Sequence, residues 1–165
     1  MKSSASRVLV LTGALLVSPF LAGRAGAQTA TATMTVTANV VASCNVVGGT
    51  LAFGNYDPTA AGPTDGSLQI SVRCTRGVSA EVGLSLGSNA TGSTRRMTNG
   101  GDFLSYELYK DPPRTIVWGN SGADLVPYTA ASNGWVNFTV QGRVSALQDV
   151  PVGPLTDTVT ITVTF

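Results

Sequence analysis

The sequence predicts an all-β protein built as an antiparallel sandwich, and three observations support this class. From residue 28 onward, apolar residues alternate with polar ones at a period of two, as in half-buried strands. Turn clusters rich in Gly, Pro, Asn and Asp separate the alternating segments at fairly regular spacing. No segment has the 3.6-residue periodicity of a convincing amphipathic helix. We therefore expect short strands that pack as two sheets.

Residues 1–27 are predicted to be a cleaved secretion signal. Lys2 and Arg7 precede an almost wholly apolar run at 8–17, and Ala-Gly-Ala at 25–27 offers small residues for cleavage. The alternative is a membrane anchor, but a span takes about 20 apolar residues, and Gly, Ser, Pro and Arg interrupt this run. Cleavage would leave 165 − 27 = 138 residues, enough for one domain.

The charge balance of the mature chain disfavours nucleic acid as a partner. Removing three basic residues with the signal leaves 10 − 3 = 7 basic against 9 acidic residues, a formal charge of −2. Binding to nucleic acid or to an anionic membrane calls for a basic surface. We therefore expect neither partner.

Cys44 and Cys74 are the two cysteines, and export favours a disulfide between them. Closing a loop of about 30 residues would stabilise the fold by roughly 3–4 kcal/mol. Two free thiols are the alternative, which the oxidising compartment reached by export disfavours. A zinc site has less support because two cysteines without any histidine do not complete a usual ligand set. We expect no metal.

The alternating segments give the expected strands in order. After the N-terminal segment, they are residues 67–74, 80–86, 103–109, 115–118, 135–144 and 158–165. In the last of these, Val159, Ile161, Val163 and Phe165 share one face, and threonines occupy the other. We expect this apolar face to border a groove that accepts a strand from a neighbouring molecule.

The N-terminal segment is too long for a single strand. Residues 28–47 contain no Gly or Pro, whereas strands usually run about 3–10 residues. A hairpin within it would need turn residues that 38–40 lack. We therefore predict that the strand of the domain begins at Val40 and that 28–39 project. The projecting apolar face consists of Ala30, Ala32, Met34, Val36 and Ala38.

A projecting apolar face would promote aggregation if it stayed bare. Pairing in a groove of another molecule, known as donor-strand complementation, would cover it. A disordered terminus is the alternative interpretation. The strict alternation around Met34 and Val36 disfavours that alternative, since a solvated tail does not need an apolar face.

Seven short motifs carry a resemblance to a known family. In chain order they are CNVVGGTLAFGNYDP (44–58), ISVRCTRG (70–77), RRM (95–97), LSYELYKD (104–111), WGN (118–120), VQGRV (140–144) and DTVTITVTF (157–165). In this combination the chain resembles the spore coat protein U domain family over nearly all of its mature length. That family includes subunits of archaic chaperone-usher pili of Gram-negative bacteria.

The resemblance implies an incomplete immunoglobulin-like β-sandwich, residues 40–165, completed by donor-strand complementation. The donor strand would lie in the extension 28–39 of the next subunit, with Ala30, Ala32, Met34, Val36 and Ala38 entering the groove. A periplasmic chaperone would first fill the groove, and an outer-membrane usher would exchange it for an identical or homologous subunit. The product would be a surface fimbrium, acting in cell adhesion or biofilm, or a spore coat. The resemblance implies no enzyme activity, cofactor or small-molecule substrate.

Two other functions compete with this assembly role. A secreted carbohydrate-binding or adhesive module would use Trp118, Trp135 or the loops near Asp57 and Arg95. Trp118 is more simply expected in the core, because large aromatic side chains dominate cores. Arg95 and Arg96 are expected at a solvated hairpin end, and Arg143 is expected to pair with an acid.

A secreted hydrolase is the third possibility. Asp57 and Asp65 could form the carboxylate pair of a glycosidase, in which one carboxyl has a raised pKa. Solvated turn aspartates are the simpler expectation. The absence of histidine from the sequence removes the Ser-His-Asp and Cys-His arrangements. We therefore expect the chain to act by association and not by catalysis.

Overall fold

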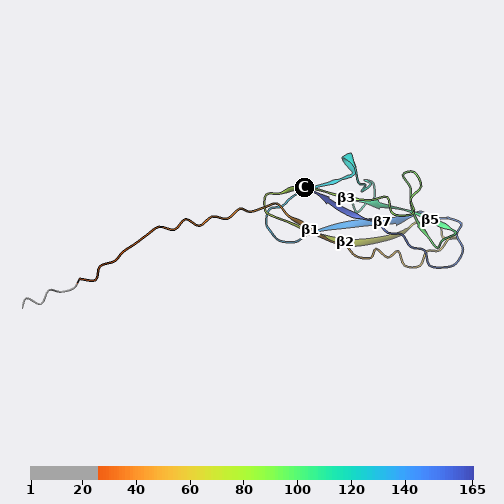
Figure 1. The fold of residues 1–165 in the computed structure, drawn as a ribbon. Helices are drawn as coiled ribbons and strands as arrows, with labels where there is room; N and C mark the ends of the chain where they lie inside the picture. Colours follow the sequence, from red (N-terminus) through yellow and green to blue (C-terminus); the bar gives the residue numbers. More distant parts are fainter. Residues whose placement is uncertain (1–25) are drawn as a thin grey trace, which may run out of the picture. The chain divides into compact units, whose positions relative to one another are not determined.

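The fold is known from a computed structural model that describes residues 26–165. The predicted signal at 1–27 falls on residues that, up to position 25, lie outside the described residues. The chain divides into a unit that ends at Ala38 and a compact unit, Asn39–Phe165. Figure 1 draws both, and each is described by itself below.

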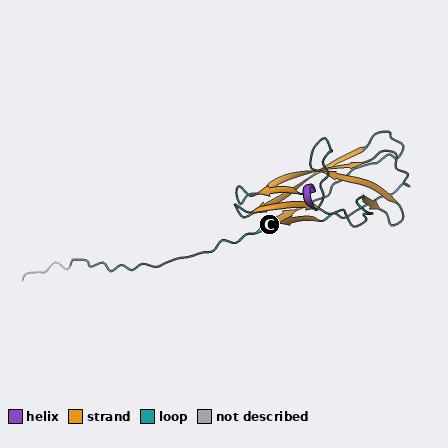
Figure 2. Cartoon of the chain, turned by 90° about the horizontal axis from the view of Figure 1, so that it is seen from above, coloured by secondary structure: helices purple, strands orange, loops and turns teal. Residues whose placement is uncertain are grey.

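The compact unit is a sandwich of two antiparallel sheets (Figure 2). Within residues 26–165 the elements are β1 (Cys44–Val47), β2 (Thr64–Cys74), β3 (Ser79–Leu84), β4 (Arg95–Thr98), β5 (Phe103–Tyr109), the 3-10 turn η1 (Gly122–Asp124), β6 (Val126–Thr129), β7 (Val136–Val144) and β8 (Ile161–Thr164). One sheet has the order β1-β2-β7-β5-β4, and the other has the order β6-β3-β8. The predicted all-β sandwich is therefore confirmed.

Alternation located most of these strands correctly. The predicted segments at 67–74, 80–86, 103–109 and 135–144 correspond to β2, β3, β5 and β7, and residue Phe103 begins β5 as expected. The predicted strand at 158–165 is shorter, since β8 is Ile161–Thr164. Residues 26–43 have no assigned strand, so the long N-terminal strand is present only as β1.

The predicted strand at 115–118 is wrong. This segment makes a single bridge, Tyr109 to Val117. The Asp111 carboxylate accepts hydrogen bonds from the backbone N–H groups of Thr115, at 3.0 Å, and Ile116, at 2.8 Å. Those donors are thus used within the loop instead of in a sheet. β4 and β6 were not expected from the sequence, because each is only four residues long.

The core lies between the two sheets and is filled mainly by the inward faces of β2, β3, β5 and β7. Trp118 is 1% exposed, and its indole Nε1 donates a hydrogen bond of 2.9 Å to the Val82 carbonyl. The expectation that Trp118 is a core residue is confirmed. Its burial removes this side chain from the candidate glycan-binding residues.

Arg95 corrects the sequence-based expectation of a solvated hairpin end. The side chain is fully buried on β4 and forms an ion pair with Glu107. Its guanidinium also donates to the carbonyl oxygens of Leu84 (3.0 Å), Ser85 (2.9 Å) and Trp118 (2.8 Å). Those carbonyls belong to the end of β3 and to the Trp118 segment, so the buried charge ties one sheet to the other. Arg has enough donors in its planar fork to satisfy all of these acceptors.

The disulfide between Cys44 and Cys74 is formed. It joins two residues that lie directly opposite each other in the β1–β2 pair. Because β1 has only four residues, the covalent link fixes the start of the domain to β2, the neighbouring strand of its larger sheet.

Replacing Arg95 by Ala is predicted to lower the free energy of unfolding by about 3–5 kcal/mol, because Glu107 and three backbone carbonyls lose a buried partner. Urea unfolding of the mature chain measures this loss. Arg76→Ala is the matched control, since Arg76 is exposed and should change stability by less than about 0.5 kcal/mol. Equal effects of the two variants would contradict the role of the buried guanidinium.

Replacing both Cys44 and Cys74 by Ala is predicted to lower the free energy of unfolding by about 3 kcal/mol, because the unfolded chain regains loop entropy. The same urea experiment measures the effect. Adding a reductant to the native protein should reproduce the loss, and it should leave the double variant unchanged. A variant as stable as the native chain would show that the bridge does not constrain this fold.

Candidate functional site

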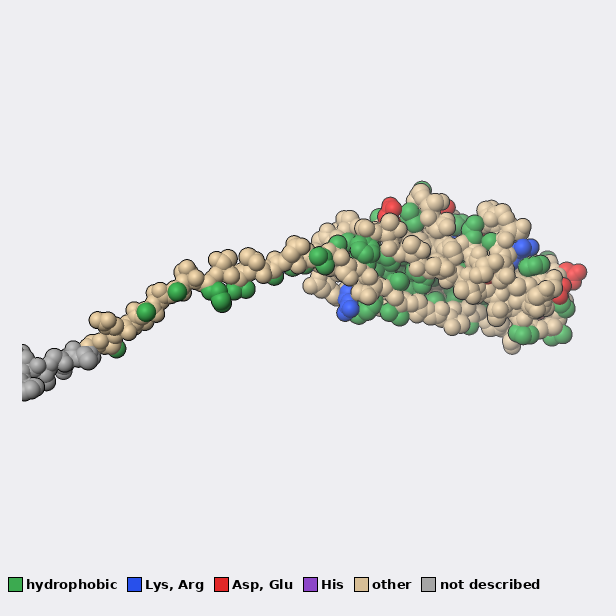
Figure 3. Space-filling view, viewed as in Figure 1, with side chains coloured by type: hydrophobic (Ala, Val, Ile, Leu, Met, Phe, Trp, Pro, Cys, Tyr) green, Lys and Arg blue, Asp and Glu red, His purple; other side chains and the backbone are tan. Residues whose placement is uncertain are grey.

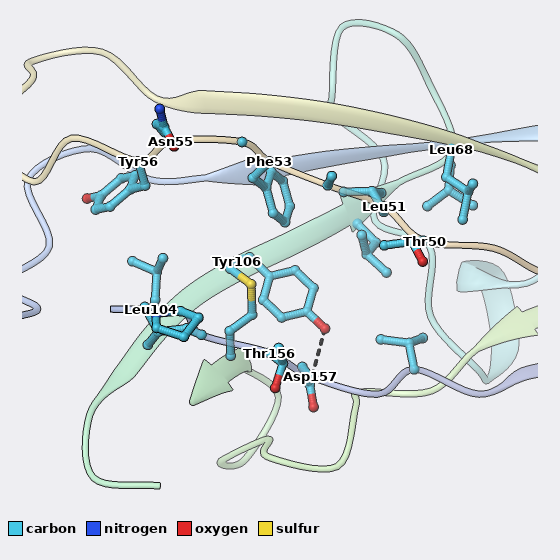
Figure 4. Close-up of a pocket in the computed structure, with 18 of the residues that line it drawn as sticks. Thr50, Leu51, Phe53, Asn55, Tyr56, Leu68, Leu104, Tyr106, Thr156 and Asp157 are labelled. Atoms are coloured by element: carbon cyan, nitrogen blue, oxygen red, sulfur yellow. Dashed lines mark hydrogen bonds between the residues drawn. The ribbon is translucent and has the colours of Figure 1, made fainter. Parts of the chain in front are cut away.

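An apolar groove of about 880 Å³ runs between residues 49–56 and residues 150–161. Hydrophobic side chains gather in a hollow of the domain surface in Figure 3, and Figure 4 shows the groove from close by. Its apolar lining comes from both walls and from the sheets beneath, and includes Leu51, Phe53, Tyr56, Leu68, Ile70, Leu84, Met97, Leu104, Tyr106, Leu108, Val140, Val150, Leu155, Val159 and Ile161. A sandwich core is therefore open along one side.

The first wall, residues 49–56, follows β1 and lies over the inner side of the larger sheet. Leu51 and Phe53 occupy space above two glycines of that sheet, Gly66 and Gly142. A Cβ atom at Gly142 would lie 2.9 Å from the Phe53 ring, so a side chain there would push this wall away. In the described part of the chain, residues 50–55 make no backbone hydrogen bond.

The second wall, residues 155–161, leads into β8. Its even-numbered residues bond to the sandwich: Thr156 pairs with Thr98, and the carbonyls of Thr158 and Thr160 accept from Ser88 (3.0 Å) and Ser85 (2.9 Å). Backbone groups of successive residues in an extended strand point to opposite sides. The N–H and C=O groups of the odd-numbered residues therefore point toward the groove.

Those groove-facing backbone groups lack partners. Among residues 26–165, no hydrogen bond is formed by the backbone groups of Leu155 or Val159, and none by the N–H or C=O of Asp157. Buried backbone polar groups are nearly always paired in native proteins. Two facing walls with free backbone groups thus form a slot that one additional strand could fill.

Asp157 holds the second wall in place. Its carboxylate accepts hydrogen bonds from the Tyr106 hydroxyl (2.7 Å; Figure 4), the Ser88 N–H (2.9 Å), the Asn89 side-chain amide (2.9 Å) and the Thr158 N–H (2.8 Å). Burial raises the pKa of Tyr106 far above its ordinary value, and the hydrogen bond to Asp157 adds to this. The phenol therefore stays a donor.

Gly87 makes room for this carboxylate. Its φ of +88° lies in the left-handed region, and a Cβ atom there would collide with Asp157. Within the described chain, Asp157 is the one charged residue that lines the groove. No sequence pattern predicts this hub, because hydrogen bonds between residues about 70 positions apart depend on the tertiary fold.

The structure places only part of the predicted acceptor face on the groove. Val159 and Ile161 line it, whereas Val163 packs against the core and Phe165 is 59% exposed beyond the lining. Sequence reasoning missed the first wall. The alternation of Leu51 and Phe53 with smaller residues was the available signal, and the neighbouring glycines concealed it.

The predicted donor residues lie in the other unit and are exposed. Met34 is 85% exposed and Val36 is 78% exposed, and Ala30, Ala32 and Ala38 are exposed as well. Figure 3 shows the hydrophobic side chains spaced along this segment.

The proposed carboxylate pair does not have the properties of a glycosidase site. Hydrogen bonds from Thr59 lower the pKa of Asp57, and the hydrogen bond from Arg143 lowers the pKa of Asp65. Neither carboxyl can therefore serve as the proton donor that such a pair needs near neutral pH. Asp57 is the expected turn aspartate, with its Oδ1 2.8 Å from the Thr59 nitrogen.

Asp65 is not a turn residue, contrary to expectation. It lies on β2 and binds Arg143 of β7 through two hydrogen bonds of 2.7 and 2.9 Å, with Arg114 3.2 Å away. The prediction that Arg143 pairs with an acid is confirmed. The pair lies on the outer face of the larger sheet and is partly exposed.

Two further properties of residues 26–165 bear on function. These residues contain no group of three or more His, Cys, Asp or Glu side chains placed to hold a metal ion. No helix within the same range is long and apolar enough to cross a membrane.

The class of protein defined by this fold is a two-sheet antiparallel β-sandwich with an open groove along one side. The spore coat protein U domain matches residues 30–162, and the chain belongs to that family. It is 38% identical to Protein U of Myxococcus xanthus over 158 residues, which cover 86% of this chain and 88% of that protein. The family is one of structural coat proteins and is not enzymatic.

A solved structure shows the same fold. The match is to the crystal structure of the CsuC–CsuE chaperone–tip adhesion subunit pre-assembly complex from archaic chaperone-usher Csu pili of Acinetobacter baumannii, with a TM-score of 0.56 and 23% identity. It covers 76% of this chain and 40% of that chain. A chaperone–tip adhesin complex of CFA/I fimbriae biogenesis matches with a TM-score of 0.37 and 16% identity, over 67% of this chain and 37% of that one.

Replacing Asp157 by Ala is predicted to lower the free energy of unfolding by about 2–4 kcal/mol, because Tyr106 and the backbone N–H groups of Ser88, Asn89 and Thr158 lose their acceptor. Thermal or urea unfolding measures it. Asp157→Asn should fall between this variant and the native chain, since the amide oxygen still accepts. Asp149→Ala is the control, as Asp149 is exposed. A loss no larger than that of the control would show that Asp157 does not hold the wall.

Proposed function

We propose that this chain is a secreted structural subunit that polymerises by donor-strand exchange. Residues 28–39 of one copy would enter the groove of the next copy and complete its sandwich. The product is a chaperone-usher pilus or a related surface or coat fibre. The function is association, and it uses no cofactor or small-molecule substrate.

The observation that carries this proposal is the groove with two unpaired walls. Residues 50–55 and the groove side of 155–159 leave backbone donors and acceptors free along an apolar slot. A strand inserted between them would satisfy both rows at once, which is the physical basis of strand addition at a sheet edge. A small apolar ligand would fill volume but would leave these groups unpaired.

The extension has the length and the pattern that the slot requires. At about 3.3 Å per residue, residues 28–39 reach roughly 40 Å and the wall 155–163 roughly 30 Å. Full burial of Met34 and of Val36 would contribute about 1.5–3 kcal/mol each. A slip of one residue would turn threonines into the groove, so the alternation also selects the face.

The proposal includes assembly partners and a route of export to the cell surface. The CsuE subunit was crystallised with its chaperone CsuC, which supports a periplasmic chaperone as the first occupant of the groove. An outer-membrane usher would then exchange the chaperone for the next subunit. The relatives are pilus and coat proteins, which indicates an extracellular surface location, and residues 1–27 would supply the export signal.

A carbohydrate-binding role is the second candidate, and one exposed aromatic residue favours it. Trp135 is 46% exposed, and the Arg73 guanidinium lies 4.8 Å from the centre of its ring. Trp118 and Arg95 are buried and cannot contact a glycan. Glycan binding that persists after deletion of residues 28–39 and is lost in Trp135→Ala would support this role.

Thermal unfolding of the chain without residues 28–39, with and without a peptide of those residues, tests the proposal. Peptide at about 100 times its dissociation constant would add about 2.7 kcal/mol of stability. In a domain of this size, we expect the melting temperature to rise by on the order of 10 °C.

A peptide with Met34 and Val36 both changed to Asp is the matched control and should give no increase, because the groove would bury two unpaired charges. A peptide with Gln28 and Asn39 both changed to Asp carries the same added charge outside the apolar face and the threonine row, and it should still raise the melting temperature. A truncated domain that melts at high temperature and ignores the native peptide would contradict the proposal.

A further inference from the structure

Five threonines form an exposed row along the second wall of the groove. Thr156, Thr158, Thr160, Thr162 and Thr164 are all exposed, whereas the residues between them, from Leu155 to Val163, are half-buried. These threonines bond their backbone groups to the sandwich side, as the Thr160–Ser85 hydrogen bond illustrates. The row therefore borders the edge at which an added strand would lie.

The extension carries a second row of the same size. Thr29, Thr31, Thr33, Thr35 and Thr37 alternate with its five apolar residues and are exposed. If the apolar face of the extension enters the groove, its threonines must face outward. They then lie on the same outer face as the row of the second wall, one strand spacing away. This inference rests on the proposed donor-strand function.

The backbone geometry brings the two rows together closely. The odd-numbered wall residues point their N–H and C=O groups at the groove, so in an antiparallel pairing they form the hydrogen-bonded pairs. The even-numbered threonines then occupy the non-hydrogen-bonded pairs. Opposing side chains approach most closely at such pairs, where Cα atoms are about 4.5 Å apart.

We infer that the two threonine rows pair with each other and set the register of the donor strand. Threonine opposite threonine is a favourable cross-strand pair. Complete overlap in antiparallel order aligns Thr33 with Thr160 and aligns all five threonines of each row. In this register Thr31 lies opposite Thr162 and Thr35 lies opposite Thr158, so the residue numbers of each pair add up to 193.

One competing register is displaced by two residues and would suit the apolar face. It aligns Thr35 with Thr160 and leaves one threonine of each row without a partner. It also places Ala38, instead of Val36, opposite Asp157. The apolar face alone favours this arrangement, because a smaller apolar group would then lie beside the carboxylate. Determining which of the two registers forms therefore shows whether the threonine face or the apolar face sets the register.

Disulfide trapping in the assembled mature chain tests the inference. Chains carrying Thr33→Cys with Thr160→Cys are compared with chains carrying Thr35→Cys with Thr160→Cys, and the native disulfide is retained. Cysteines bridge only when their Cα atoms lie about 4.4–6.8 Å apart. We expect a covalent ladder of oligomers on non-reducing gels from the first pair, and little from the second. Met34→Cys with Thr160→Cys is the control for opposite faces and should give no ladder.

A ladder mainly from the pair 35 and 160, or equal ladders from both pairs, would overturn the inference while the donor-strand function stands. A native chain that forms no oligomers resistant to cold detergent would overturn both.

The role of the hydroxyls is tested by Thr33→Val and Thr160→Val, alone and combined, which keep the β-branched shape. We expect the two changes to be coupled by about two- to fivefold in the dissociation rate of assembled subunits. Independent effects of the two valines would contradict pairing of the hydroxyl rows.

Discussion

The structure depends on one constraint: each backbone polar group removed from water must find a partner. Along the groove, the backbone groups of residues 50–55 and of the odd-numbered residues of 155–159 have no partner in the described chain. If these backbone groups were hydrogen-bonded within the chain, they would provide no driving force for association with another molecule. The free edges are therefore the source of both the specificity and the affinity that we propose for assembly.

An open groove is useful only if it keeps its shape while empty. Two polar hubs keep it so, and both lie where the sheets meet. Arg95 binds the end of β3 and the Trp118 segment from β4, and Asp157 binds the Tyr106 hydroxyl and the loop at Ser88. Several hydrogen bonds fix each of these two side chains, so Arg95 and Asp157 hold the backbone segments around the groove in position. Apolar packing alone would allow the walls to collapse over the gap, because hydrophobic contact is not directional.

Sequence patterns predicted the parts of the fold that have long, half-buried strands. β2, β5 and β7 alternate over seven or more residues, and the family resemblance supplied the role of the groove. Short elements failed: β4 and β6 have four residues each, and Thr115 was assigned to a strand although Asp111 holds it in a loop. The sequence predicts a solvated charge at Arg95, because it does not reveal a buried set of carbonyl acceptors. Val159 and Ile161 were placed on the wall by alternation, whereas Leu51 and Phe53 needed the tertiary fold.

Hydrogen exchange of single backbone amides tests the central claim most directly. The mature chain is compared as a monomer and after assembly, at the amides of Val159, Leu51 and Phe53, with Val82 in the core as the reference. We predict fast exchange at the wall amides in the monomer and slow exchange after assembly, with Val82 slow in both states, because an inserted strand would bind the free N–H groups. Wall amides that are already protected in the monomer, or that stay unprotected in the assembled protein, would contradict the account.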